Sequence, residues 1–144
     1  MLIRDILSAK GSTVVSIGPV NSVHEAVTLL ASENLGALVV MKGDEVTGII
    51  TERDILRLAA RSPHLLTTHT VGEVMTTEVI VANPGDRIAY AMEIMTRNRI
   101  RHLPIMDEGS LVGIVSIGDL VDALRDHTEA ENKYLKDYIS GTAG

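Results

Sequence analysis

The chain has 144 residues, 45% of them hydrophobic, which suffices for one compact domain or two half-size units and argues against disorder. A formal charge of −6 and the absence of Phe and Trp disfavour nucleic-acid binding, and no apolar run approaches the ~18 residues that a membrane helix needs. The N-terminus is too short and too charged for a secretory signal and cysteine is absent, so we expect a soluble, cytoplasmic protein without disulfides or thiolate chemistry.

The first half of the chain predicts a strand, a helix, a hairpin and a second helix. The β-branched run TVVSI (13–17) ends at a Gly-Pro turn and indicates a strand. Apolar residues at helical spacing over 21–34 predict a helix, with Asn21 or Ser22 as its N-cap. Two apolar runs follow, about four residues apart as in a hairpin, and a further helix is expected from Thr51.

The second half predicts the same elements in the same order, ending in a helix from Ser116. This last helix is expected to continue through the charged tail, up to a stop signal at Gly141. The expected strand, helix and two hairpin strands are 78–82, 86–98, 102–106 and 111–115.

The order is repeated because the sequence is. A shift of 65 residues aligns 14–57 with 79–122 without a gap, and Asp54 falls on Asp119. One unit has too little interior to be stable alone, whereas two can bury their sheets against each other. We therefore predict an α+β fold of duplicated β-α-β-β-α units with pseudo-twofold symmetry. The predicted parts are a first repeat with the N-terminal segment (1–61), a linker (62–73), a second repeat (74–126) and a C-terminal helical extension (127–144).

Each repeat carries the same motif at the end of its hairpin, GIITERD at 48–54 and GIVSIGD at 113–119. A hydroxyl and an acid three residues apart suit a helix capping box, which is the simpler interpretation. A helix N-terminus beside a strand end also offers free N–H groups and a positive dipole end to a phosphate or a polyol. A carboxylate there can accept hydrogen bonds from two ribose hydroxyls. Two such motifs in register favour paired ligand clefts, and the two interpretations are compatible.

These motifs, together with VVSIGPVNSVHEAVTLL and RHLPIMDEGSLVGIVSIGDL, resemble a tandem pair of cystathionine-β-synthase (CBS) domains, often called a Bateman module. The resemblance covers Ile6 to about Arg125. It implies a flat α+β disc that commonly forms a homodimer and binds an adenosine-type ligand between its repeats. AMP, ADP and ATP are the leading candidates, with S-adenosylmethionine or NAD as further options, and no cofactor is required. Members of the family serve as regulatory sensors.

The resemblance also assigns binding roles by position. Asp54 and Asp119 would hold ribose hydroxyls, while Thr51 and Ser116 would approach the ribose or the phosphate. Pro104 matches the family's LPV-like strand. Adenine would pack between aliphatic side chains, which requires apolar area rather than aromatic rings. The residues expected to border the base are Thr13, Val14, Val15, Glu78, Val79, Ile80, Gly36, Ala37, Arg101 and His102.

Positive charge differs between the repeats. Three arginines and His102 fall within TRNRIRH (96–102), whereas the aligned ASENLGA (31–37) has no cation. These cations either neutralise a helix C-terminus, for roughly a few tenths of a kcal/mol, or join Arg53 in supplying charge to a phosphate. We expect unequal clefts, at least one of them suited to an anionic nucleotide, and the sequence leaves open which cleft Arg101 and His102 face.

Three classes of function follow from these features. The leading prediction is a non-catalytic regulatory CBS pair that binds an adenine nucleotide and signals to an unknown effector protein. The alternative is a structural dimerisation module with empty or vestigial clefts. An enzyme is disfavoured because no nucleophile is paired with a base and acid, and no dinucleotide or phosphate-loop motif occurs. We therefore expect no catalytic residues, and the scattered histidines predict no metal site.

Overall fold

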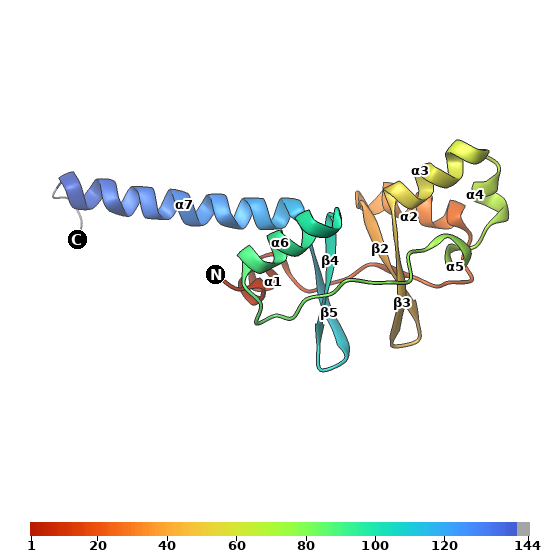
Figure 1. The fold of residues 1–144 in the computed structure, drawn as a ribbon, viewed down its shortest axis with the longest axis horizontal. Helices are drawn as coiled ribbons and strands as arrows, with labels where there is room; N and C mark the ends of the chain where they lie inside the picture. The colour runs from red at the N-terminus through yellow and green to blue at the C-terminus, as the bar shows by residue number, and fades with distance from the viewer. Residues whose placement is uncertain (141–144) are drawn as a thin grey trace.

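The computed structural model describes residues 1–140, with side chains through Asp137, so the expected stop at Gly141 lies outside the described residues. The chain folds into two small sheets with helices packed around them (Figure 1). The elements in chain order are α1 (Ile3–Lys10), β1 (Ser16–Ile17), α2 (Val23–Glu33), β2 (Ala37–Lys42), β3 (Glu45–Thr51), α3 (Glu52–Arg61), α4 (Leu65–Thr68), α5 (Val71–Val74), α6 (Ile88–Asn98), β4 (His102–Asp107), β5 (Ser110–Ser116) and α7 (Ile117–Ser140).

The first repeat has a three-stranded sheet in the order β1-β2-β3, with β1 parallel to β2 and β2 antiparallel to β3. The predicted hairpin and both helices are confirmed, and Ser22 is the N-cap of α2, accepting a hydrogen bond from Glu25 N at 3.1 Å. The expected strand 13–17 is shorter than predicted, because only Ser16 and Ile17 pair with β2.

The second repeat has only the β4-β5 hairpin as regular sheet. The predicted strand over 78–82 is wrong: it is reduced to a single parallel bridge between Ala82 and Ile105. Ala82 N donates to Pro104 O at 3.1 Å, and Met106 N donates to Ala82 O at 2.8 Å. Extending this parallel ladder toward the N-terminus would need an N–H at position 104, which proline lacks.

Two hydrophobic clusters form the interior, one in each repeat, and the short helices are exchanged between them. Helix α1 comes first in the chain but buries Ile3 and Ile6 in the second-repeat cluster. Helix α5 precedes the second repeat but buries Val71 in the first-repeat cluster, which Leu65 and Leu66 of α4 also contact. Helix α1 accordingly contacts β5 and α7, and α5 contacts β3 (Figure 1). The predicted linker thus forms α4 and the start of α5 and closes the first core.

Helix α7 leaves the second repeat and extends well beyond it (Figure 1). Its tail is mostly exposed, including Tyr134 and Leu135 at 65% and 52%. Within residues 1–140, no helix combines the length and apolar character needed to cross a membrane. The predicted duplicated α+β architecture is confirmed.

Candidate functional site

A cavity of about 430 Å³ lies where the start of α3 meets the segment preceding α6 and the turn before β4. Both repeats contribute to it, so we call it the Asp54 pocket after the first-repeat carboxylate on its wall. Its lining residues are Gly36, Ile49, Thr51, Glu52, Arg53, Asp54, Arg57, Thr76, Glu78, Val79, Ile80, Asn98, Arg99, Ile100, Arg101, His102 and Pro104.

Asp54 is held at the N-terminus of α3 by the predicted capping box. Thr51 N donates to Asp54 Oδ2 at 2.9 Å, and Asp54 N donates to Thr51 Oγ1 at 3.4 Å. The capping interpretation is therefore confirmed, and it fixes the side chain's orientation. A carboxylate has about four acceptor sites, so capping leaves Asp54 able to accept further hydrogen bonds.

Thr76 is one such further donor, and the sequence motif does not include it. Its Oγ1 lies 3.3 Å from Asp54 Oδ1. Thr76 reaches this position because it forms an isolated antiparallel bridge with Ile49, with N–O distances of 2.8 and 2.9 Å. The contact crosses from one repeat to the segment leading into the other, so only tertiary structure brings it about.

One wall of the pocket is aliphatic. Val79, Ile80 and Ile100 are partly buried, and Pro104 is buried. The predicted border residues Glu78, Val79, Ile80 and Pro104 therefore do line a cavity together. An aliphatic surface is suited to a flat heterocycle.

The pocket is also lined by positively charged arginine side chains. The expected Arg53 and Arg101 line the pocket, joined by Arg57 and Arg99, which were not among the predicted site residues. Arg57 follows Arg53 by one helical turn, a spacing that the sequence contained. Arg97, by contrast, pairs with Glu93 and does not line the cavity. The question that the sequence left open is thus answered for Arg101: it faces the cleft of Asp54.

His102 faces the same cavity and lies between the two repeats. Burial lowers the pKa of His102 below its usual value, while the charges of Glu52 and Asp119 act to raise it. Gly36 leaves room for this ring, because a Cβ there would be 3.0 Å from His102 Nε2 and 2.5 Å from Glu52 Oε1. At neutral pH the imidazole is therefore uncharged and available as a hydrogen-bond partner.

The second motif has a different environment. Ser116 N donates to Asp119 Oδ2 at 2.8 Å and Asp119 N donates to Ser116 Oγ at 3.1 Å, so the cap is repeated. Lys10 Nζ also lies 2.7 Å from Asp119 Oδ2. Burial opposes ionisation of Asp119, but the hydrogen bonds and charge of Lys10 and the Ser116 amide outweigh it and hold its pKa below the usual value. Neither Asp119 nor Ser116 lines the Asp54 pocket.

Four other predicted residues also lie outside this pocket: Thr13, Val14, Val15 and Ala37. Val15 packs against the first-repeat core, and Ala37 is buried at the start of β2. The structure therefore assembles ten of the sixteen predicted residues around one cavity. Among the described residues no group of three or more His, Cys, Asp or Glu side chains could hold a metal ion.

Comparison with known proteins gives the same fold and the same two-repeat organisation. The CBS domain family matches residues 3–61 and 71–126. The chain is 36% identical over 148 residues to the mitochondrial CBS domain-containing protein CBSX3 of Arabidopsis thaliana, covering 96% of this chain and 72% of that protein. It is 39% identical over 119 residues to the CBS domain-containing protein YhcV of Bacillus subtilis, covering 82% and 81%. It also matches inosine-5'-monophosphate dehydrogenase of Thermoplasma acidophilum at 36% identity, but spans only 23% of that enzyme.

Solved structures agree. The CBS-domain containing protein ATU1752 from Agrobacterium tumefaciens superposes with a TM-score of 0.83 at 38% identity, covering 85% of this chain and 98% of that one. The CBS domain pair of protein MJ0100, solved with 5'-methylthioadenosine and S-adenosyl-L-methionine, gives 0.78 at 26% identity, covering 88% and 98%. With the family matched over both repeats and the fold reproduced at this identity, the chain belongs to the CBS domain family as a tandem CBS pair.

Proposed function

We propose that this CBS pair is a non-catalytic regulatory protein that binds an adenine nucleotide in the Asp54 pocket and signals its presence to a separate effector protein. The ligand would span both repeats, with its ribose at α3 and its base against the aliphatic wall.

The observation that carries the proposal is the convergence of three chemistries in one cavity. Asp54 offers a carboxylate to vicinal hydroxyls, Val79 and Ile80 offer an apolar wall, and Arg99 and Arg101 offer cations to a phosphate. Charge-assisted hydrogen bonds to such groups contribute roughly 1.5–3 kcal/mol each. A nucleotide is the common small molecule that presents all three groups at once.

A solved relative supports the choice of an adenosine compound. The CBS pair of MJ0100 was solved with 5'-methylthioadenosine and S-adenosyl-L-methionine, both of which contain adenosine. Neither of those two ligands carries a phosphate, whereas the Asp54 pocket is lined by arginines. We therefore favour AMP, ADP or ATP for this chain.

The remaining parts of the proposal concern assembly and location. We expect a homodimer, and the hexameric CBS-CP12 protein of bloom-forming cyanobacteria, 30% identical, illustrates that relatives assemble. The chain has no cysteine and suits a reducing compartment such as the cytoplasm, although the Arabidopsis relative is named as mitochondrial. A structural module with vestigial clefts is the competing function, and ligand binding separates the two.

A thermal denaturation series with adenosine, AMP, ADP, ATP, S-adenosylmethionine and NAD tests the proposal. A true ligand at ~100 times its dissociation constant should stabilise the fold by about 2.7 kcal/mol. Asp54→Asn keeps a capping side chain but removes the charge, so it should weaken binding of the ribonucleotide and leave the 2'-deoxy analogue less affected. Asp44→Asn, in the exposed β2–β3 turn, is the matched control. If none of the six compounds stabilises the wild-type protein, the structural module is the correct function.

A further inference from the structure

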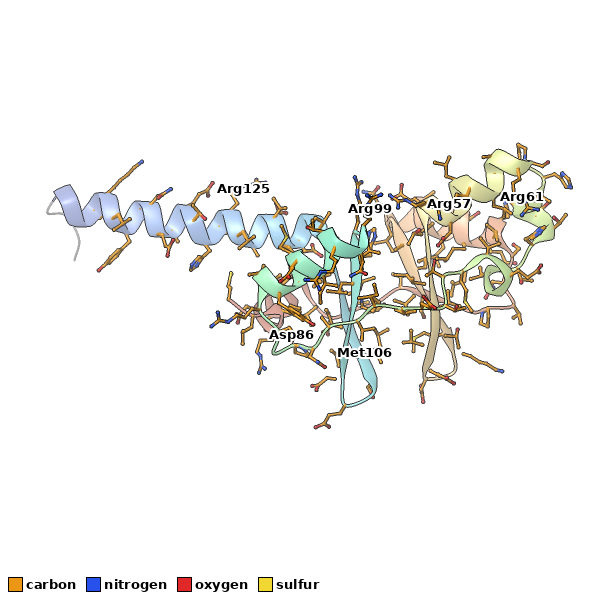
Figure 2. All side chains as sticks on the ribbon, viewed as in Figure 1. Arg57, Arg61, Asp86, Arg99, Met106 and Arg125 are labelled. Atoms are coloured by element: carbon orange, nitrogen blue, oxygen red, sulfur yellow. The ribbon has the colours of Figure 1, made fainter. Side chains whose placement is uncertain are left out.

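The four arginine side chains of the Asp54 pocket have no partner among the side chains that the structure describes, residues 1–137. Arg53 and Arg57 lie on α3, and Arg99 and Arg101 lie in the turn between α6 and β4. Within residues 1–137, none of these four guanidinium groups forms an ion pair or a side-chain hydrogen bond. Figure 2 shows Arg57 and Arg99 on the same side of the molecule, where α3 approaches the end of α6.

The internal repeat shows that the fold itself does not require these charges. The 65-residue shift places Gly118 and Asp122 opposite Arg53 and Arg57, and Asn34 and Gly36 opposite Arg99 and Arg101. The same helix start and the same helix-to-strand turn thus form in the other copy with no cation at these four positions. Four unpaired like charges gathered at one cleft of a protein with net charge −6 therefore require an explanation other than folding.

The backbone conformation of Arg99 is a second, independent indication of a binding role. It ends α6 in the left-handed conformation with φ of 54°, and its counterpart Asn34 ends α2 with φ of 56°. Asn tolerates this conformation well, whereas a long side chain adopts it at an energetic cost. The second repeat therefore carries the less favourable residue at a position whose side chain lines the pocket. Such exceptions to local preference concentrate at binding sites.

The number of guanidinium groups exceeds what is needed to neutralise one phosphate. A terminal phosphate has three acceptor oxygens, and each guanidinium binds phosphate through two N–H groups. Because a monophosphate carries a charge of about −2 at neutral pH, two arginines neutralise it. Four arginines, drawn in pairs from two separate elements, outnumber the three carboxylates on the pocket wall, Glu52, Asp54 and Glu78.

We infer that the Asp54 pocket selects nucleoside di- and triphosphates over monophosphates, with Arg57 and Arg99 as the residues that recognise the added phosphates. This inference rests on the proposed nucleotide site and specifies its ligand class. Arg53 and Arg101 lie nearest in sequence to the capping Thr51 and to His102, and they serve the phosphate closest to the ribose.

Calorimetric titration without divalent metal, using adenosine, AMP, ADP and ATP, tests this selectivity. We expect ADP and ATP to bind at least tenfold more tightly than AMP. Arg57→Ala and Arg99→Asn should each weaken ATP binding about tenfold, the loss of one charge-assisted contact, and leave adenosine binding unchanged. Arg61→Ala is the control, because Arg61 is exposed on the same helix but does not line the pocket.

Arg99→Asn also restores the residue of the first repeat, so the ligand-free variant should be at least as stable to heat as the wild type. A weaker ATP complex on a fold of equal or greater stability cannot be attributed to misfolding. Equal affinity for AMP and ATP, or an equal loss for adenosine and ATP in the variants, would overturn the inference while leaving the nucleotide site intact. Failure of all four compounds to bind would overturn both.

Discussion

Lys10 Nζ lies 2.7 Å from Asp119 Oδ2 and also donates to Ile114 O at 3.0 Å. A residue of the first helix of the chain thus forms an ion pair with the motif carboxylate of the second repeat. The equivalent acid of the first repeat, Asp54, receives a neutral hydroxyl from Thr76 instead. The reason is the exchange of short helices. Helix α1 spans eight residues and its counterpart α5 spans four, so α1 extends a further turn and brings Lys10 to the second motif. The two motifs are alike in sequence, but their carboxylates differ in whether a cation of the protein already binds them.

The Lys10–Asp119 contact predicts one bound nucleotide per chain. A ribose at Asp119 would have to compete with an ammonium group that already pairs with Oδ2 of the carboxylate. Lys10→Met removes that competitor and should allow a second, weaker binding event for adenosine, which calorimetry would detect as a stoichiometry above one. Lys42→Met, at the exposed end of β2, is the control and should leave the stoichiometry at one. Two equal binding events in the wild type would contradict the prediction.

The same contact predicts a pH-dependent contribution to stability. The pKa of Asp119 is below its usual value, so its ionised form stabilises the folded state at pH values above about 3.9, and this contribution is lost as the pH falls through the lowered pKa. The side chains of Lys10 and Asp119 are 37% and 25% exposed, so screening limits the pair to about 1 kcal/mol.

Urea denaturation of Lys10→Met and the wild type, repeated from pH 7 to pH 3, measures this contribution. The variant should be less stable by about 1 kcal/mol at pH 7, and the difference should narrow as the pH falls below about 3.9. A difference that stays constant down to pH 3 would show that the methionine acts through packing and not through the ion pair.

Because the pKa of His102 is lowered in the ligand-free protein, we expect the protein to take up a proton when a nucleotide binds. Burial lowers its pKa, against the carboxylates of Glu52 and Asp119, while Arg101 and Lys10 add to the lowering. A phosphate in the pocket adds negative charge and raises the pKa of His102 again. The binding enthalpy measured by calorimetry at pH 6 should therefore vary with the ionisation enthalpy of the buffer.

The His102→Asn variant separates this proton from the one carried by the phosphate itself. Proton uptake should fall in the variant by the share belonging to His102, and the same uptake in both proteins would contradict the prediction. In the ligand-free protein, the lowered pKa of His102 makes folding stability depend on pH. Stability should decrease as the pH falls from about 6.5 through the folded-state pKa, because the unfolded chain binds the proton more readily.

Gly48 packs closely against the segment that follows α5, which allows the packing of this segment on the first repeat to be tested. A Cβ at Gly48 would lie 2.5 Å from Met75 Sδ and 2.8 Å from the backbone oxygen of Thr76. Gly48→Ala must push this segment outward, so we expect a loss of about 1–3 kcal/mol in unfolding free energy. The displacement also moves Thr76 from Asp54, so nucleotide affinity should fall. Gly118→Ala is the control, because it lies in the first turn of α7 with only a 3.6 Å contact, and chemical denaturation compares the two. Equal stability of both variants would show that α5 is loosely seated.

Several parts of the site could be predicted from local sequence. The hydroxyl and acid of Thr51 and Asp54 are three residues apart, and that spacing alone forms the capping box that orients the carboxylate. Arg53 and Arg57 share one helix face for the same local reason. The strand expected at 78–82 does not form because its partner β4 has Pro104, which lacks the N–H that a longer parallel ladder would need.

Other parts depended on contacts between distant segments. Thr76 donates to Asp54 across 22 residues and Lys10 to Asp119 across 109, and neither pair shares a motif. Hydrophobic periodicity, capping and turn residues are local, so by themselves they determined a duplicated α+β chain with two equivalent-looking carboxylates. Only the tertiary structure, by packing α1 on the second repeat and α5 on the first, decided that Asp119 is bound by an ammonium group and that Asp54 lines an arginine-rich cavity. Side-chain charge acts through space over a few ångströms, and the chain order does not say which segments come that close.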